Sequence, residues 1–352
     1  MDFTFTEDQL AFKEAISRFL MTEAPPEMLR DIWETEEGRS PELHRSIAAQ
    51  GLTALSVPEA QGGLGMDDIA WSLLTQELGY YAIPDSMVDT AYVAAGLLTA
   101  LPDSVVQRND MLEQVAAGEM RIAVAHSINP LAADVHLADQ VIVEHQGEVH
   151  FLSRDEIEQV NNISIDSSRR LSKISFSASD SSRALDAQAG QAVWGETLNR
   201  GALAVAGQSL GLAQRMLDLS VDYAVQRKQF GKPIGSFQAV KHKMADVVSG
   251  IEFAKPALYR AAYALVHGDP RADLHVSHAK LACTEAALVA ARHGIQVHGA
   301  MGYTWEADLQ MFMKRAWALN ASWGTREFHR QRIANDIFAD GAAVGPRYTF
   351  GE

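Results

Sequence analysis

Apolar residues recur every three or four positions through the first part of the chain, which is the period of a helix that buries one face. Thr6 and Gln9 have the spacing of a capping box, so we expect a further helix to begin there. We expect residues 1–118 to form an N-terminal helical domain. The periodic segments within it predict three helices, over Leu43–Leu52, Ile69–Leu78 and Thr90–Ala100.

The pattern changes near Gly118, where short runs of β-branched residues separated by turn residues replace the helical period. The runs RIAVAHSI, QVIVEHQGEVHFL and KISFSAS predict strands. Gln146–Gly147 lies between two apolar runs and has the composition of a hairpin turn. We expect residues 119–189 to form a small central β domain.

Helical periodicity returns at Val193 and continues almost to the end of the chain. Gly231 and Pro233 should end the first long helix, and Ser236 should cap the next one. The order of elements predicts a mainly α fold with a small central β domain, in which residues 190–352 form a C-terminal helical bundle. Further helices in this region are predicted over Ala272–His293, over Leu309–Leu319 and from Thr325 onward.

The chain is acidic: its 352 residues carry a formal net charge of −15 at pH 7. Such a surface repels nucleic-acid phosphates and anionic lipid, so an anionic ligand requires a local basic pocket. The single cysteine, Cys283, excludes an internal disulfide framework and favours a reducing compartment. The sequence shows neither the features of a targeting peptide nor a run of eighteen apolar residues. We expect a cytoplasmic protein with neither a nucleic-acid nor a membrane partner.

Two motifs of catalytic proteins occur, and both have a structural explanation. GQSLG at residues 207–211 fits the nucleophile elbow, but that elbow needs a strand before the serine, and this serine lies inside a predicted helix. His275 and His278 are three residues apart, but no His-Glu-x-x-His motif or cysteine pair accompanies them as a metal site would require. We interpret the glycines as helix-packing residues and the histidines as core or solvated side chains.

One basic stretch, QRKQFGKPIGSFQAVKHK at residues 226–243, stands out in this acidic chain. A charge run is commonly a solvated helix face. Here, however, Arg227, Lys228 and Lys232 surround a predicted helix end, just before the next helix begins. A helix N-terminus with a guanidinium group is a good receptor for a pyrophosphate. The small residues of QVHGAMGY, residues 296–303, would let the backbone approach such a ligand closely.

These two stretches resemble the acyl-CoA dehydrogenase family. YAVQRKQFGKPIGSFQAVKHKMADV is similar to its Arg-x-x-Phe-Gly signature, and GIQVHGAMGYTWEADLQMFMKRA to its Gln-x-x-Gly segment. FTEDQLAFKEAISRFL and GLTALSVPEAQGGLGMDDIAWSLLTQELG resemble its N-terminal domain. The resemblance covers most of the chain. It implies the family's architecture: an N-terminal helical domain, a middle β-sheet or barrel domain and a C-terminal four-helix bundle.

The resemblance implies an FAD-dependent enzyme that desaturates an acyl-CoA thioester and passes electrons to an electron-transfer flavoprotein. In this family a carboxylate removes the α-proton while the β-hydrogen leaves as hydride to the flavin. By resemblance, Arg227 would contact the FAD pyrophosphate in the neighbouring subunit. Further cofactor-binding groups would be Phe230, Gln238, Gln296, Gly299, Ala300 and Thr325.

The positions from which family members take their catalytic base carry no acid here. Trp323 stands directly before a Gly-Thr pair, where many members have a Glu. Other members take the base from the long helix, at a position that matches Gly201. Neither residue can accept a proton, and Glu196 and Glu306 are the fallback candidates. The middle region also lacks the Ser and Thr pattern with which the family grips the flavin ring.

These losses predict one subunit of a heteromeric acyl-CoA dehydrogenase, paired with a paralogue that carries the Glu and the contacts to the flavin ring. The short length and divergent sheet region resemble subunits of the α2β2 bacterial enzymes that desaturate steroid side-chain CoA thioesters. A bulky, steroid-like acyl group is therefore expected. Two alternatives stay open: a self-sufficient homo-oligomer whose base is Glu196 or Glu306, and a non-catalytic scaffold subunit.

Overall fold

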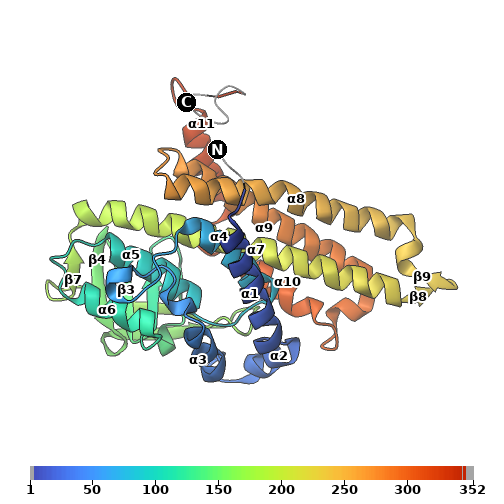
Figure 1. Cartoon of the computed structure of the whole chain (residues 1–352), viewed down its shortest axis with the longest axis horizontal. Coiled ribbons are helices and arrows are strands. Elements are labelled where there is room, and N and C mark those ends of the chain that lie inside the picture. Colours follow the sequence, from blue (N-terminus) through green and yellow to red (C-terminus); the bar gives the residue numbers. More distant parts are fainter. Residues whose placement is uncertain (1–3, 343, 346–352) are drawn as a thin grey trace. The chain divides into compact units, whose positions relative to one another are not determined.

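The computed structural model describes residues 4–342, 344 and 345 and divides into two compact units (Figure 1). The helical unit consists of Met1–Arg18, Asp68–Ala82 and Val205–Glu352. The sheet unit consists of Phe19–Asp67 and Ile83–Ala204.

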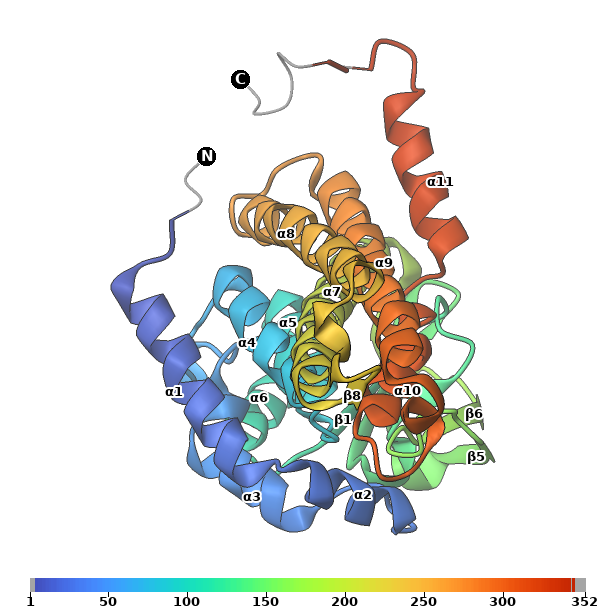
Figure 2. The same cartoon turned by 90° about the vertical axis from the view of Figure 1, so that its right-hand side faces the viewer.

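Long helices that pack side by side form the helical unit (Figures 1 and 2). In it α9 is the central element, because α8, α10 and α11 all pack against it, and α4 packs against α8. The long α7 begins in the sheet unit and ends in this one. The helices are α1 (Glu7–Glu23), α4 (Asp68–Tyr80), α7 (Ala187–Gln226), α8 (Gln238–Val266), α9 (Ala272–His298), α10 (Leu309–Asn320) and α11 (Arg326–Ile337).

The glycines of the GQSLG segment allow α7 to lie directly against α4. A Cβ atom added at Gly207 would clash with the Thr75 hydroxyl, and one at Gly211 would clash with the Gln76 carbonyl. Ser209 between them is fully buried in the middle of the helix. The interpretation of this segment as a helix-packing motif is confirmed, since no strand precedes the serine and no sharp turn exposes it.

The sheet unit combines short helices with two small sheets. In the first sheet the strand order is β1-β3-β4-β7, with β1 parallel to β3; in the second it is β2-β6-β5, antiparallel throughout. The strands are β1 (Ile122–Ala125), β2 (Ala132–Ala133), β3 (Gln140–His145), β4 (Glu148–Ser153), β5 (Ile157–Asn162), β6 (Leu171–Phe176) and β7 (Arg183–Leu185). The helices are α2 (Pro26–Glu34), α3 (Pro41–Ala49), the π-helical η3 (Val88–Ala94), α5 (Ala95–Ala100) and α6 (Gln107–Ala117).

Continuous apolar runs, not strict alternation, build the sheet core: Val141, Ile142 and Val143 of β3 are all buried. Side chains that point inward from β1, β3 and β4 meet Val135 and Ile157 in one buried cluster. The predicted hairpin at Gln146–Gly147 joins β3 to β4, and both turn residues have positive φ, 54° and 86°. This is the φ combination of a two-residue type I′ turn, whose twist matches that of the strands.

The predicted mainly α fold with a small β region is confirmed, and so are the capping box and the start of α1. The Thr6 amide donates to the Gln9 side chain at 3.0 Å, and the Gln9 amide donates to the Thr6 hydroxyl at 3.2 Å. The sequence did not predict α2, α6, the strands β2, β5 and β7, or the small hairpin that follows α7. The domain boundaries at residues 118 and 189 stay predictions. In the part of the chain that the structure describes, none of the helices combines the length and the apolar character needed to cross a bilayer.

We expect Gly211→Ala to destabilise the protein, because its new methyl group must push α7 away from the Gln76 carbonyl. Overpacking of this kind typically costs about 1–3 kcal/mol. Gly195→Ala is the matched control, since it lies in the same helix with nothing within 4 Å of the added carbon. That control should be neutral or should stabilise by up to about 1 kcal/mol. Urea unfolding followed by circular dichroism measures both, and equal effects would contradict the close helix contact.

Candidate functional site

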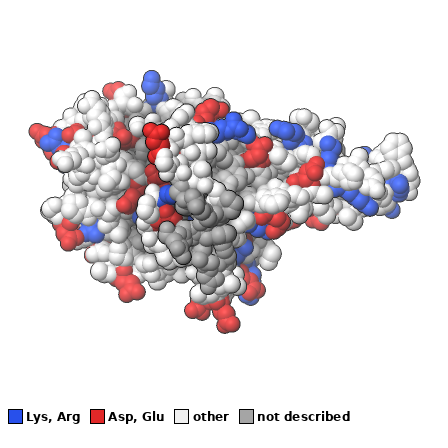
Figure 3. Space-filling view, turned by 90° about the horizontal axis from the view of Figure 1, so that it is seen from above, with Lys and Arg blue, Asp and Glu red and all other residues white. Residues whose placement is uncertain are grey.

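A short hairpin connects α7 to α8 and carries part of the basic stretch. β8 (Lys228–Gln229) pairs antiparallel with β9 (Lys232–Pro233). The pairing extends to the foot of the hairpin, where the Ile234 amide donates to the Arg227 carbonyl at 2.8 Å. Figure 3 shows Lys and Arg side chains along this end of the helical unit. The chain thus presents local positive charge on an exposed element despite its acidic composition.

Phe230, at the tip of this hairpin, has a strained backbone. Its φ is 53°, followed by 79° at Gly231. Glycine adopts such values freely, whereas a residue with a side chain loses roughly 1–2 kcal/mol. Phe230 is also 90% exposed, so burial does not offset the strain. An exposed aromatic side chain on a strained turn indicates a residue that faces a ligand or another chain.

The junction between the hairpin and α8 differs from its prediction. Phe237, not Ser236, is the N-cap residue of α8, and it provides no side-chain cap. The Ser236 hydroxyl instead donates to the Pro233 carbonyl at 2.8 Å, because residues 234–236 form a 3₁₀ turn that points it back toward the hairpin. Gln238 is therefore the first residue of α8, and its side chain is exposed.

The second predicted stretch lies at the same end of the helical unit. The ring of Tyr223, one turn before the end of α7, stacks on His298 at the end of α9, with ring centroids 4.3 Å apart and planes 18° apart. The Tyr223 carbonyl also accepts the Arg227 amide at 2.8 Å, so the foot of the hairpin is fixed beside the end of α9. Gln296 and the Gly299–Ala300 pair are exposed there.

Six of the predicted residues thus gather around one end of the helical unit: Arg227, Phe230, Gln238, Gln296, Gly299 and Ala300. Gly299 has φ 60°, and a Cβ atom added there would meet nothing within 4 Å, so its backbone is open to a ligand. The group combines a guanidinium, an exposed ring, amides and bare backbone. This chemistry suits an elongated anionic ligand, and the exposure of the group means that such a ligand lies partly outside this chain.

Thr325 has a different local environment. It is the N-cap of α11, and its hydroxyl accepts the Phe328 amide at 3.3 Å. The neighbouring Arg326 forms an ion pair with Glu285 of α9 at 2.6 Å. Glu285 precedes Gln296 by eleven residues, which is roughly 16 Å along a helix axis. Thr325 therefore does not belong to the cluster at the hairpin, and its predicted contact with a cofactor stays a prediction.

Trp323 lies in a tightly held turn between α10 and α11. Its side chain is 6% exposed, and φ is positive at Trp323 (55°) and Gly324 (98°). His329 donates from Nε2 to the Trp323 carbonyl at 2.9 Å, while its Nδ1 accepts from Ser277 at 3.1 Å. Buried Lys280 donates to the Asn320 carbonyl at 3.1 Å. The turn keeps a defined shape although it carries no acid.

The other predicted positions for a base do not offer a buried carboxylate either. Gly201 is buried within α7. The Glu196 side chain is 60% exposed and lies 3.6 Å from Arg200, one helical turn further along. Glu306 is exposed, and a hydrogen bond from the Thr304 side chain lowers the pKa of its carboxyl. A general base near neutral pH needs the opposite shift, so Glu306 does not have the environment of one. Glu196 is exposed and paired with Arg200 instead of buried in a pocket.

The sheet unit contains an ionic network that sequence reasoning missed. Arg39, in the loop between α2 and α3, forms a bidentate bond with Asp134 at 2.6 Å, and both side chains are buried. The two residues are 95 positions apart, so no local pattern could pair them. Nearby, His44 lies 3.1 Å from Asp85. Burial alone would raise the pKa of Asp85, but the bond to His44 and the charges of His44, Arg39 and Arg121 together lower it. These bonds fix loops to the sheet.

Asp89 is an unusual carboxylate in the π-helical segment η3. Burial, together with the charge of Asp134, raises the pKa of Asp89 to about 6. The segment replaces part of the predicted helix over Thr90–Ala100, and π-helical turns often occur near functional sites. No sequence signal marks this residue, because its shift comes from a tertiary contact.

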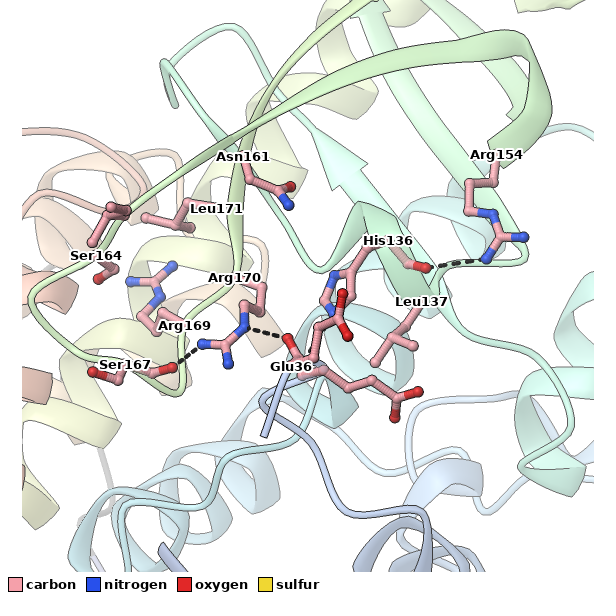
Figure 4. Close-up of a pocket in the computed structure, with 12 residues that line it drawn as sticks. Glu36, His136, Leu137, Arg154, Asn161, Ser164, Ser167, Arg169, Arg170 and Leu171 are labelled. Carbon is pink, nitrogen blue, oxygen red and sulfur yellow. Dashed lines mark hydrogen bonds between the residues drawn. The ribbon is translucent and has the colours of Figure 1, made fainter. Parts of the chain in front are cut away.

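A cavity of about 730 Å³ opens in the sheet unit beside the α2–α3 loop (Figure 4). Arg170 donates to the carbonyls of Glu36, Thr35 and Ser167, and Arg154 donates to the carbonyl of His136 at 3.1 Å. The carboxylates of Glu36 and Glu37 share the lining. Because Arg154 and Arg170 hold loops together and the lining carries both signs of charge, the cavity does not have the character of an anion site.

Metal binding has no support in the structure. Among the residues that it describes, no group of three His, Cys, Asp or Glu side chains could hold a metal ion. His275 and His298 are buried, and burial lowers the pKa of each, to about 4 for His275. His275 is therefore a core side chain, one of the two alternatives predicted for it, and His298 is another core side chain.

Acid should destabilise the protein through His329. Burial lowers the pKa of His329 to about 4, below the ordinary value of 6.5 that applies in the unfolded chain. The stability contributed by the neutral ring is complete above pH 6.5 and is lost as the pH falls toward 4. Between pH 7 and pH 5 this loss is about 2 kcal/mol.

Urea unfolding at several pH values tests this expectation. His329→Gln should flatten the dependence between pH 7 and pH 5 relative to the wild type, because glutamine does not titrate. His242→Gln, at an exposed position on α8, is the control and should keep the wild-type curve. An unchanged slope in His329→Gln would show that this ring does not carry the effect.

Comparison with known families gives matches over most of the chain. Residues 6–119 match the model of the acyl-CoA dehydrogenase N-terminal domain, and residues 188–338 match that of the C-terminal domain. The acyl-CoA dehydrogenase IpdE2 of Mycobacterium tuberculosis is 30% identical over 311 residues, which cover 88% of this chain and 91% of that protein.

Solved structures share the fold at low sequence identity. The ChsE4–ChsE5 complex from Mycobacterium tuberculosis contains a chain with a TM-score of 0.85 and 20% identity, covering 98% of this chain and 100% of that one. A variant of the Tcur3481–Tcur3483 steroid acyl-CoA dehydrogenase gives a TM-score of 0.83 at 22% identity, covering 96% of this chain and 99% of that one. The architecture of helical, β and helical regions is the one that the sequence resemblance implied.

Proposed function

The chain belongs to the acyl-CoA dehydrogenase family of FAD-dependent oxidoreductases, and on this premise we propose that it is the base-lacking subunit of a heteromer. In this proposal the chain lends FAD-binding groups to a partner subunit that carries the catalytic Glu. The complex desaturates an acyl-CoA thioester between its α and β carbons.

The cluster at the hairpin fits one part of FAD. Arg227 offers a guanidinium for the diphosphate, and Gln296 with the open backbone of Gly299 offers hydrogen bonds toward the adenosine end. The exposed ring of Phe230 offers a surface for stacking. When bound, the flavin accepts hydride from the β carbon of the substrate. This chain's own residues would then hold the cofactor from outside, since all of these groups point into solvent rather than into a cavity.

The observation that carries the proposal is the contrast between this exposed cluster and the two base positions. Trp323 and Gly201 are both buried, and neither has a group that can take up a proton. An α-proton cannot be removed without a base, so the proposed reaction requires a carboxylate base from another chain. The chain has kept a cluster that suits a flavin in another subunit and has no base for one of its own.

Known relatives support a paralogous partner. The fold matches chains of the ChsE4–ChsE5 complex and of the Tcur3481–Tcur3483 steroid acyl-CoA dehydrogenase, and both names describe assemblies of two different chains. By analogy we propose an α2β2 heterotetramer that acts on a bulky, steroid-like acyl-CoA and passes its electrons to an electron-transfer flavoprotein. The sequence of the sheet region lacks the Ser and Thr pattern with which the family grips the flavin ring, which supports a flavin held mainly by the partner.

Arg227→Ala should remove FAD from the complex. The test uses this chain co-purified with a paralogous acyl-CoA dehydrogenase that carries the catalytic Glu, and it measures bound flavin by absorbance after dialysis. Loss of a charge-assisted bond to a phosphate should weaken binding at least about tenfold. Arg227→Lys should be intermediate, and Arg330→Ala, an exposed cation on α11, should match the wild type. Full flavin in the Arg227→Ala complex would favour a scaffold role instead.

The isolated chain should show no turnover, because it contains no base at either family position. In the complex, Glu→Gln at the partner's base should abolish activity, whereas Glu196→Gln and Glu306→Gln in this chain should leave it within about twofold. Removal of a true general base costs roughly 10²–10⁴ in rate, so the assay separates the cases clearly. Turnover by the chain alone, lost in one of its glutamate variants, would establish the homo-oligomer.

Phe230→Asn should separate stability from cofactor binding. Asparagine tolerates positive φ better than phenylalanine, so the variant should be as stable as the wild type or more stable by up to about 1 kcal/mol. It should nevertheless lose flavin from the complex, because the exposed ring is removed. Thermal unfolding and flavin absorbance measure the two effects. A variant that gains stability and keeps all its FAD would show that Phe230 does not contribute to cofactor binding.

A further inference from the structure

The hairpin has two distinguishable faces. Gln229 lies opposite Lys232, and Lys228 lies opposite Pro233. Successive side chains of a strand point to opposite faces, whereas directly opposed residues share one. Because the bond from Ile234 to Arg227 continues the ladder, Arg227 and Lys232 fall on one face and Lys228 on the other.

Lys232 is held in place by an aromatic ring. Its Nζ lies over the ring of Phe237, 4.4 Å from the centroid. Phe237 also meets the ring of Phe230, edge to face, with centroids 6.1 Å apart and planes at 90°. A free lysine side chain samples many rotamers, so a cation–π contact of this kind limits where its ammonium lies. Phe237 thereby ties Phe230 and Lys232 to the start of α8.

We propose that Lys232 is a second diphosphate-binding cation of the flavin site and that Phe237 is the residue that positions it. This proposal rests on the proposed function. A diphosphate has two negative phosphates, whereas one guanidinium fork pairs closely with one of them. Arg227 and Lys232 are diagonal neighbours on one face of the hairpin, a separation that two long side chains can close around a single ligand. Because Phe237 contacts both Phe230 and Lys232, it would present these two side chains to the cofactor together.

Lys232→Met and Lys228→Met form a matched pair, since each removes one charge from the same hairpin and keeps the aliphatic stem. The dissociation constant of FAD is measured for the purified complex over a range of salt concentrations. Lys232→Met should weaken FAD binding about three- to tenfold and should reduce its salt dependence. Lys228→Met should stay within about twofold of the wild type. Equal losses in both variants would overturn the assignment, because they would reflect net charge alone.

Phe237 is tested by substitution and rescue. Phe237→Leu keeps apolar bulk but removes the π face, and it should weaken FAD binding to about the level of Lys232→Met. Phe237→Tyr should restore it, and the double variant Lys232→Met/Phe237→Leu should be no weaker than either single variant. An additive loss in the double variant would show that Phe237 does not act through Lys232.

Arg227→Ala separates this proposal from the one on which it rests. If Arg227→Ala loses FAD and Lys232→Met does not, the second cation is wrong and the donated site stands. If Arg227→Ala retains FAD while Lys232→Met loses it, Lys232 is a phosphate contact without the Arg227 partnership. If both retain FAD, both proposals fall. Circular dichroism of each complex verifies that the variants are folded.

Discussion

The stack between Tyr223 and His298 is the contact on which the candidate site depends. It joins the end of α7 to the end of α9, two points 75 residues apart in the sequence. Near it, Gly294 of α9 packs closely against Ser220 of α7, so the hairpin and the Gln296–Ala300 segment leave two helix ends that are held together. The stack also fixes the first residue of the hairpin, Arg227, because the Arg227 amide donates to the Tyr223 carbonyl. Burial also lowers the pKa of His298, which favours the neutral ring in this stack.

Two aromatic residues of the helical unit have similar positive φ values but differ in exposure and in the contacts that hold them. Phe230 and Trp323 have φ values of 53° and 55°. Phe230 is 90% exposed, so burial does not offset its strain, whereas Trp323 is buried and its carbonyl accepts a bond from His329. Strain with exposure indicates interaction with something outside the chain. Strain with burial and a bonded carbonyl indicates a turn that the fold itself maintains.

Sequence periodicity was enough to place most of the long helices, and turn composition located the hairpin at Gln146–Gly147. Local rules also gave the capping box at Thr6. They failed where two competing local structures were available, as at Ser236, which bonds to Pro233 instead of capping α8. They could not reach Arg39 with Asp134, the raised pKa of Asp89 or the stack of Tyr223 on His298. Each of these depends on residues brought together from distant parts of the chain.

When two chains bind one cofactor together, cofactor binding and subunit association are thermodynamically coupled. If FAD contacts both the donated hairpin and the partner's fold, the free energy of flavin binding adds to that of subunit pairing, and by linkage each strengthens the other by the same factor. The acidic surface adds selectivity to this coupling, because a chain of net charge −15 attracts an anionic cofactor only where cations are concentrated. Arg227 and its neighbours supply that concentration at one end of one unit. In the proposed heteromer, a chain without a base therefore acts only as part of the assembled complex.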